Sequence, residues 1–217
     1  MLSSRSFRPL SSIAPGAAVL LVLALAGCGG VSSAAPKGPT PNARDMRLSA
    51  RISASAKAIT IDYTLMNDGA DMVVAFTGIP AKDSVAVAKV DPNAVYVTAE
   101  DGVVQLSKQV FAHEGEGPDP FLVRGVALVG GESMTEKVTV PLPLVSRTPY
   151  PASDSAKATL PSPVKSLRFC VGVALQNQLN PRQPDPSDSD THLAYSHDSG
   201  TAGAQLLVCS PTAAMPS

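Results

Sequence analysis

The 217-residue chain has no tryptophan and only nine other large aromatic residues, four tyrosines and five phenylalanines. Proteins that hold single-stranded nucleic acids or sugars commonly stack them on aromatic side chains, so such platforms are not expected here. Charged residues make up only 16% of the chain, and the formal net charge is −1. No basic stripe is available to contact phosphates, so nucleic acid is not expected as a partner.

Strong catalytic motifs are missing as well, including the P-loop, the nucleophile elbow, H-E-x-x-H and the glycine fingerprint of dinucleotide-binding proteins. Ser162-Pro163-Val164-Lys165 matches the S-x-x-K motif of penicillin-binding proteins. That chemistry needs the lysine one helical turn from the serine, whereas this motif lies in a proline-rich stretch without its companion motifs. We therefore expect that the protein is not an enzyme and has no catalytic residue. A serine hydrolase with Ser162 as its nucleophile is a remote alternative.

The N-terminal leader is the most informative part of the chain. Arg5 and Arg8 precede an apolar run of eleven residues, Ala17 to Gly27, which is shorter than the ~20 residues of a spanning helix. Leu25-Ala26-Gly27-Cys28 resembles the lipobox of bacterial lipoproteins. The resemblance implies cleavage before Cys28 and lipidation of this residue with long acyl chains such as palmitate. The protein would then be anchored to a membrane of the bacterial cell envelope, on its periplasmic or outer face.

Three segments follow from this reading, with residues 1–27 as signal peptide, 28–45 as flexible tether and 46–217 as folded domain. The tether consists mainly of small residues, serine and proline, which bury too little apolar surface to fold. Without Arg5 and Arg8, the remaining chain has 15 Lys and Arg against 18 Asp and Glu, a formal charge of −3. Its membrane partner would be reached through the lipid and not through a basic patch.

The chain has only three cysteines. If Cys28 is lipidated, Cys170 and Cys209 remain as one disulfide pair in an oxidising envelope compartment. Two buried free thiols are the alternative, and a four-cysteine zinc site is excluded. The disulfide would close a loop of about forty residues and contribute roughly 3–4 kcal/mol.

Apolar residues alternate with polar ones from Met46 onward, which predicts short β-strands. The expected strands are residues 48–52, 59–65, 72–79, 85–90, 94–98, 103–111, 122–129, 134–140, 167–175 and 205–209.

Turn signals connect these strands. Asp101-Gly102 predicts a type I′ hairpin, and Gly130-Gly131 predicts a second hairpin. Six prolines between residues 141 and 163 predict a long surface crossover. The pattern favours an all-β fold, an immunoglobulin-like sandwich of about 7–9 strands, with a cupredoxin-like barrel as the alternative.

The segment from Ile61 to Ala70 resembles the aromatic-x-x-x-Asn strand-to-turn phrase of bacterial immunoglobulin-like envelope domains, here Tyr63 to Asn67. The core tryptophan and the cysteine spacing of antibody domains are absent.

Two groups of residues are candidate metal ligands. One is the Asp185–His192 loop with Tyr195, His197 and Asp198, which lacks the glycine and late glutamate of EF-hand calcium loops. The other is His113 with methionines, which are copper(I) ligands, but no Met-x-Met or His-x-Met motif is present. These methionines are Met66, Met72 and Met134. We assign no metal and no cofactor, and keep envelope metal handling as the alternative function.

The expected function is therefore binding or assembly, without catalysis, by a lipid-anchored envelope lipoprotein. Its partner would be an envelope protein or a cell-wall component. The expected contact surfaces are two long loops, residues 112–122 and 176–203, because loops on a rigid sheet frame carry variable chemistry. Deletion of residues 181–200 is expected to leave the melting of the fold nearly unchanged.

Overall fold

The computed structural model describes residues 39–80, 90–112, 122–149, 159–179, 192–196 and 199–215, and these residues form an all-β fold. The strands are β1 (Met46–Ala54), β2 (Ala58–Asn67), β3 (Val73–Pro80), β4 (Val90–Asp91), β5 (Tyr96–Glu100), β6 (Val103–Lys108), β7 (Leu122–Leu128), β8 (Ser133–Pro141), β9 (Ser166–Leu175), β10 (His192–Ser196), β11 (Gln205–Cys209) and β12 (Ala213–Ala214). The helical elements described are η1 (Ala43–Asp45), η3 (Gln176–Gln178) and α1 (Ser199–Ala204). The described residues thus form more strands than the seven to nine expected. Two of the additional strands, β4 and β12, have only two residues each and are too short to leave a pattern in the sequence.

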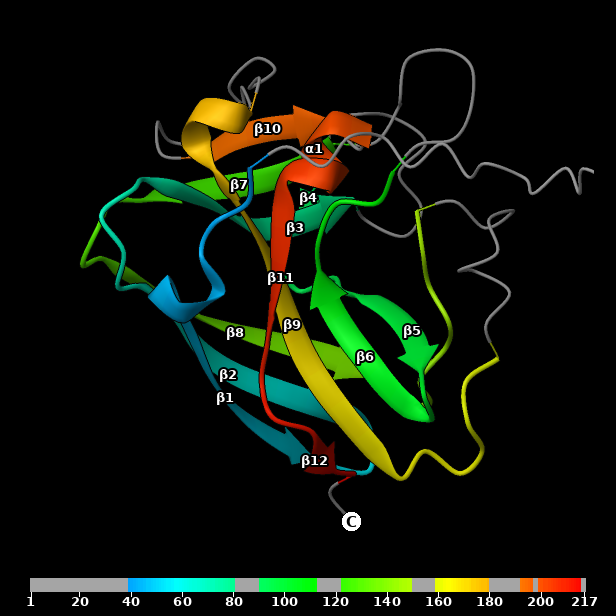
Figure 1. The fold of residues 1–217 in the computed structure, drawn as a ribbon. Helices are drawn as coiled ribbons and strands as arrows, with labels where there is room; N and C mark the ends of the chain where they lie inside the picture. Colours follow the sequence, from blue (N-terminus) through cyan, green and yellow to red (C-terminus); the bar gives the residue numbers. More distant parts are fainter. Residues whose placement is uncertain are drawn as a thin grey trace, which may run out of the picture. The chain divides into compact units, whose positions relative to one another are not determined.

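The strands form two sheets, as expected for a sandwich. The small sheet has the order β1-β2-β8 and is antiparallel throughout. The large sheet runs β10-β7-β3-β9-β6-β5, with β4 paired to β3 (Figure 1). β9 is its central strand, since β6 and then β3 pair along one edge while β12 and β11 pair along the other. The β6–β9 pair is parallel.

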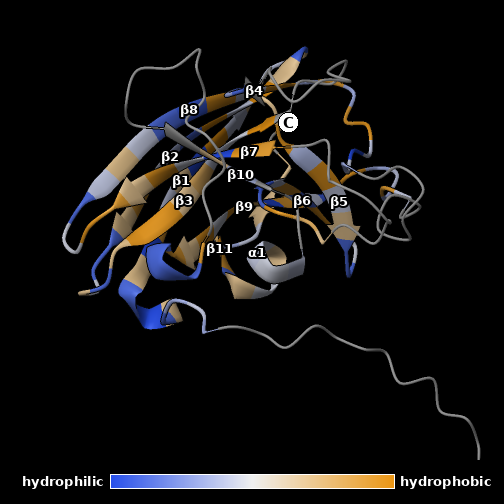
Figure 2. Cartoon of the chain, turned by 90° about the horizontal axis from the view of Figure 1, so that it is seen from above, coloured by the Kyte–Doolittle hydropathy of each residue, from blue (hydrophilic) through white to orange (hydrophobic). Residues whose placement is uncertain are grey.

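The main core lies between the two sheets and follows the period-two pattern of the sequence. Alternate β2 side chains point inward and are almost fully buried, namely Ile59, Ile61, Tyr63 and Leu65. Figure 2 shows the matching hydrophilic and hydrophobic bands along β8. Tyr63 of the small sheet meets Phe169 of the large sheet with ring centroids 4.7 Å apart. Full burial of side chains of this size contributes about 1.5–3 kcal/mol each.

A second hydrophobic cluster includes residues of β3, β7, β9 and β10. Tyr195 of β10 is 1% exposed and packs edge-to-face on Phe76, with centroids 5.9 Å apart. Gly125 makes room for this ring, because a Cβ there would lie 2.7 Å from Tyr195 and 2.5 Å from Val74.

The expectation of one long loop over residues 176–203 is therefore wrong. The segment contains η3, the edge strand β10 and most of α1. Deletion of residues 181–200 would remove a strand and the buried Tyr195 side chain, so the deletion is now expected to lower the melting temperature of the fold.

The two predicted hairpins have different outcomes. Asp101-Gly102 does join β5 to β6, and both residues have the positive φ angles, 51° and 78°, that a type I′ turn requires. The Gly130-Gly131 hairpin is wrong, because β7 pairs with β3 and β10 in the large sheet whereas β8 pairs with β2 in the small sheet. The glycine pair carries the chain from one sheet to the other.

Asn67 explains why these glycines make a crossing. It is 1% exposed, and its Nδ2 donates to the carbonyls of Asp71 and Leu128 while its Oδ1 accepts from the Gly69 amide. The chain crosses between sheets on both sides of this residue, after β2 and after β7. A Cβ on Gly130 would lie 2.4 Å from the Gly69 carbonyl oxygen, so the two crossings pack closely.

The remaining expectations concern connecting segments. The predicted strand 85–90 lies outside the described residues except for Val90, and residues 113–121 of the 112–122 loop also lie outside them. In its described parts the proline-rich segment has no regular element after Pro141, which agrees with a crossover. Pro41 is buried and η1 forms directly before β1, so the described end of the predicted tether belongs to the fold.

Candidate functional site

A groove of about 300 Å³ lies where the end of β8, the start of the crossover and the start of β5 meet. Its lining is mainly aliphatic and proline, with two charged residues. The lining residues are Asp91, Asn93, Ala94, Val95, Val97, Thr139, Val140, Pro141, Pro143, Leu144, Val145, Ser146 and Arg147. Val145 is 65% exposed, which is unusual for a large aliphatic side chain in this fold.

Local chemistry accounts for the groove. Pro141 and Pro143 have no amide hydrogen and cannot continue the β8 ladder, so the strand ends there. The chain then approaches β5 at a single bridge, where the amides of Val97 and Arg147 each donate to the other's carbonyl at 2.9 Å. The Ser146 hydroxyl donates to the same Val97 carbonyl at 3.4 Å. Between these two fixed points, the crossover leaves the hollow open.

The polar groups of the groove are suited to orienting a ligand. The Asp91 carboxylate accepts from the Asn93 amide at 2.8 Å, and the Arg147 guanidinium lies 5.9 Å from the centre of the Tyr96 ring. The lining includes no histidine, cysteine or aromatic residue. An aliphatic hollow with a few polar groups is the usual composition of a binding site.

A second feature is a charged cluster inside the sandwich. The Lys108 side chain has no exposed surface, and its Nζ donates to Glu136 Oε2 at 2.8 Å. The Tyr63 hydroxyl donates to the same oxygen at 2.5 Å, and Lys108 Nζ lies 5.7 Å from the centre of the Tyr63 ring. Three strands supply the three groups, β6, β8 and β2.

Burial sets the protonation behaviour of this cluster. It lowers the pKa of Lys108 below the ordinary value, while the Glu136 carboxylate opposes this shift. Asp91 also favours the charged amine, and Arg124 disfavours it. The pKa of Tyr63 is raised well above its ordinary value, first by burial and then by Glu136. Tyr63 is therefore a hydrogen-bond donor over the whole physiological range.

This cluster was not predicted from the sequence, although the sequence contains a signal for it. On β6 the inward positions are Val104, Leu106 and then Lys108, and on β8 Glu136 stands between the inward Met134 and Val138. A charged residue at an apolar position of a period-two pattern marks a buried charge, and buried charges need partners.

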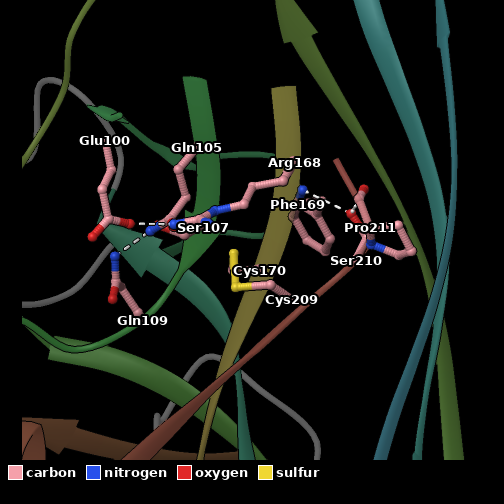
Figure 3. Close-up of a disulfide and its surroundings, with 10 residues drawn as sticks. All are labelled: Glu100, Gln105, Ser107, Gln109, Arg168, Phe169, Cys170, Cys209, Ser210 and Pro211. Atoms are coloured by element: carbon pink, nitrogen blue, oxygen red, sulfur yellow. Dashed lines mark hydrogen bonds and ion pairs between the residues drawn. A yellow bond between two sulfur atoms is a disulfide. The ribbon is translucent and has the colours of Figure 1, made fainter. Parts of the chain in front are cut away.

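The predicted disulfide is present. Cys170 of β9 and Cys209 of β11 stand directly opposite each other, and the bond closes a separation of 39 residues (Figure 3). Next to it, the Ser210 amide donates to the Phe169 carbonyl and the Phe169 amide donates to the Ser210 hydroxyl. The disulfide thus lies within a row of hydrogen bonds along the central strand β9, and this row continues past the end of β11.

The other predicted site residues are not brought together within the described part of the chain. Cys28, His113 and His197 lie outside the described residues, and Tyr195 belongs to the core and not to a metal loop. Met66 accepts a hydrogen bond from Arg47, Met72 is 41% exposed and Met134 packs on the main core. Over the described ranges, no three His, Cys, Asp or Glu residues gather in a way that could hold a metal ion.

Ser162 and Lys165 are both exposed and lie in an irregular stretch directly before β9. No helix is present there to place the amine one turn from the hydroxyl, which is the arrangement that the S-x-x-K motif needs.

Comparisons with known proteins give no relatives, since no family model, curated protein or solved structure matches the chain. In the part of the chain that is described, no helix is both long enough and apolar enough to cross a membrane.

Proposed function

We propose that this protein is a lipid-anchored lipoprotein of the bacterial cell envelope whose sandwich domain binds a partner without catalysis. The groove at the start of the crossover carries the proposal. It is aliphatic, it is framed by two sheets, and Val145 stands exposed at it. Rigid sheets that present an irregular segment are a common arrangement for binding.

The partner that fits this groove best is an apolar segment of another envelope protein. A volume of about 300 Å³ accommodates a few aliphatic side chains, and Asp91 and Arg147 can fix their orientation. A cell-wall glycan fits less well, because sugar rings are commonly held against aromatic side chains and the groove lining has none.

The anchor is the part of the proposal that rests on the lipobox resemblance. Acyl chains on Cys28 would hold the domain at a membrane surface. A single acyl chain binds a membrane only reversibly, and one or two chains in addition to the first make the anchoring stable. The chain after the leader has a formal charge of −3, so it offers no basic substitute for the lipid.

Replacement of the acylated residue tests the anchor. Cys28→Ser should block lipidation and move the protein from the membrane fraction to the soluble fraction of cells, measured by immunoblotting. The matched control is Cys209→Ser, which also removes one thiol and should leave the protein with the membranes. A Cys28→Ser protein that fractionates like the wild type would contradict the lipoprotein assignment.

A further inference from the structure

Lys108 and Glu136 connect the two sheets through the interior of the sandwich. Lys108 ends β6 in the large sheet, and Glu136 lies in the middle of β8 in the small sheet. The Lys108 side chain is fully buried, and its amine lies 2.8 Å from one carboxyl oxygen of Glu136, whose side chain is 26% exposed. Burial of a charged amine and a carboxylate costs solvation energy that a surface ion pair does not lose. The neutral amine and the neutral acid are therefore less unfavourable here, relative to the charged pair, than they are in water.

We propose that the Lys108 amine and the Glu136 carboxyl condense to an intramolecular amide, an isopeptide bond that joins the two sheets covalently. The geometry places the nucleophile against the carboxyl group, as reactions between fixed groups require. This proposal concerns the core of the domain and does not depend on the proposed function.

The reaction balances within the cluster. Transfer of one proton from the ammonium of Lys108 to the Glu136 carboxylate, along their hydrogen bond, gives a neutral amine and a neutral acid. The amine lone pair then forms the Nζ–Cδ bond, the Cδ–O bond breaks, and one water molecule leaves with the two hydrogens that the reactants lose. No oxidant, metal or further reactant is needed.

Tyr63 acts as a positioning residue for this step. Its hydroxyl donates to Glu136 Oε2, the oxygen that takes the proton from Lys108 and leaves as water, so this hydrogen bond assists the departure of that oxygen from the carboxyl carbon. Because the pKa of Tyr63 is raised, the phenol keeps its proton throughout. The partial exposure of Glu136 gives the released water a route to solvent.

The direct test is the mass of the reduced full-length protein purified from cells, compared with that of a Lys108→Arg variant. Arginine keeps the positive charge but is not a comparable nucleophile. The wild type should be lighter than its sequence and lipid require by one water, whereas the variant should match its own sequence and lipid. Tandem fragmentation of the wild-type digest should show tryptic peptide 125–137 attached to Lys108, where trypsin no longer cuts.

A Tyr63→Phe variant keeps both reactants and removes only the phenol hydroxyl. It should fold with the same ring in the core and contain a smaller linked fraction than the wild type. The wild-type measurement decides the proposal even if the variants fold poorly. Wild-type protein at its full mass, with trypsin cleavage after Lys108, would overturn the proposal and leave a buried ion pair.

Discussion

Tyr195 shows how one side chain couples the edge strand β10 to the core. Its ring is buried against Phe76, and burial raises the pKa of its phenol to about 12 from 10.0. In the folded protein the phenol therefore keeps its proton at a pH where the unfolded chain has lost it. The folded state binds more protons in this window, so stability falls as pH rises.

This sign predicts an alkaline loss of stability that depends on Tyr195. Between pH 10.0 and about 12 the phenol should remove up to roughly 2–3 kcal/mol of unfolding free energy, from 1.36 kcal/mol per pKa unit. In Tyr195→Phe the decline should be shallower by that amount, measured by urea unfolding at several pH values. Below pH 10 the two proteins should show parallel pH dependence. Identical alkaline slopes would contradict a buried phenol at this position.

At the scale of elements, β9 organises the large sheet and the disulfide ties it to β11. The bond closes a 39-residue separation that contains β10 and α1, the elements that the sequence analysis treated as a loop. Cross-linking a separation of this length restricts the unfolded chain and is worth about 2–4 kcal/mol.

A Cys170→Ser, Cys209→Ser double variant should therefore unfold at lower urea concentration, with a loss of about 2–4 kcal/mol. Wild-type protein unfolded in the presence of a thiol reductant is the matched control, and it should approach the stability of the double variant. Equal midpoints for oxidised wild type and double variant would show that the bond contributes nothing.

Sequence patterns predicted those elements whose inward side chains are consistently apolar. Ile59, Ile61 and Leu65 alternate with polar residues, so the pattern predicted β2. Asp101-Gly102 between two strands commonly forms a hairpin turn, so the β5–β6 hairpin was predicted as well. The second hairpin failed because a glycine pair allows a sharp change of direction, and only the hydrogen bonds of Asn67 decide that the change leads to the other sheet. Those bonds are long-range and leave no local pattern.

The same limit applies to β10 and to the groove. β10 lies in a segment rich in aspartate, serine and proline, and its pairing with β7 spans a long stretch of sequence. The groove requires β8, β5 and the crossover to be placed together, which no local pattern encodes. The disulfide was predictable because two cysteines leave one pairing once Cys28 is assigned to lipid.

On the scale of the whole molecule, the proposed lipid anchor would hold a sandwich whose described part presents an aliphatic groove between its two sheets. The two sheets are tied by the core, by the crossings at Asn67 and by the Lys108–Glu136 pair. Such a frame lets the crossover hold its exposed side chains in place at low entropic cost on binding. The central claim is that a protein partner occupies this groove.

Site-specific photocrosslinking in living cells tests that claim most directly. A photoreactive amino acid in place of Val145 should give a discrete crosslinked product with one envelope protein. The same probe in place of Ser49, exposed on β1, should not give it. A second substitution in the groove, Thr139→Glu at an exposed position, should abolish the product while the melting temperature stays close to that of the probe variant. No product from position 145, or the same product from both positions, would contradict the account.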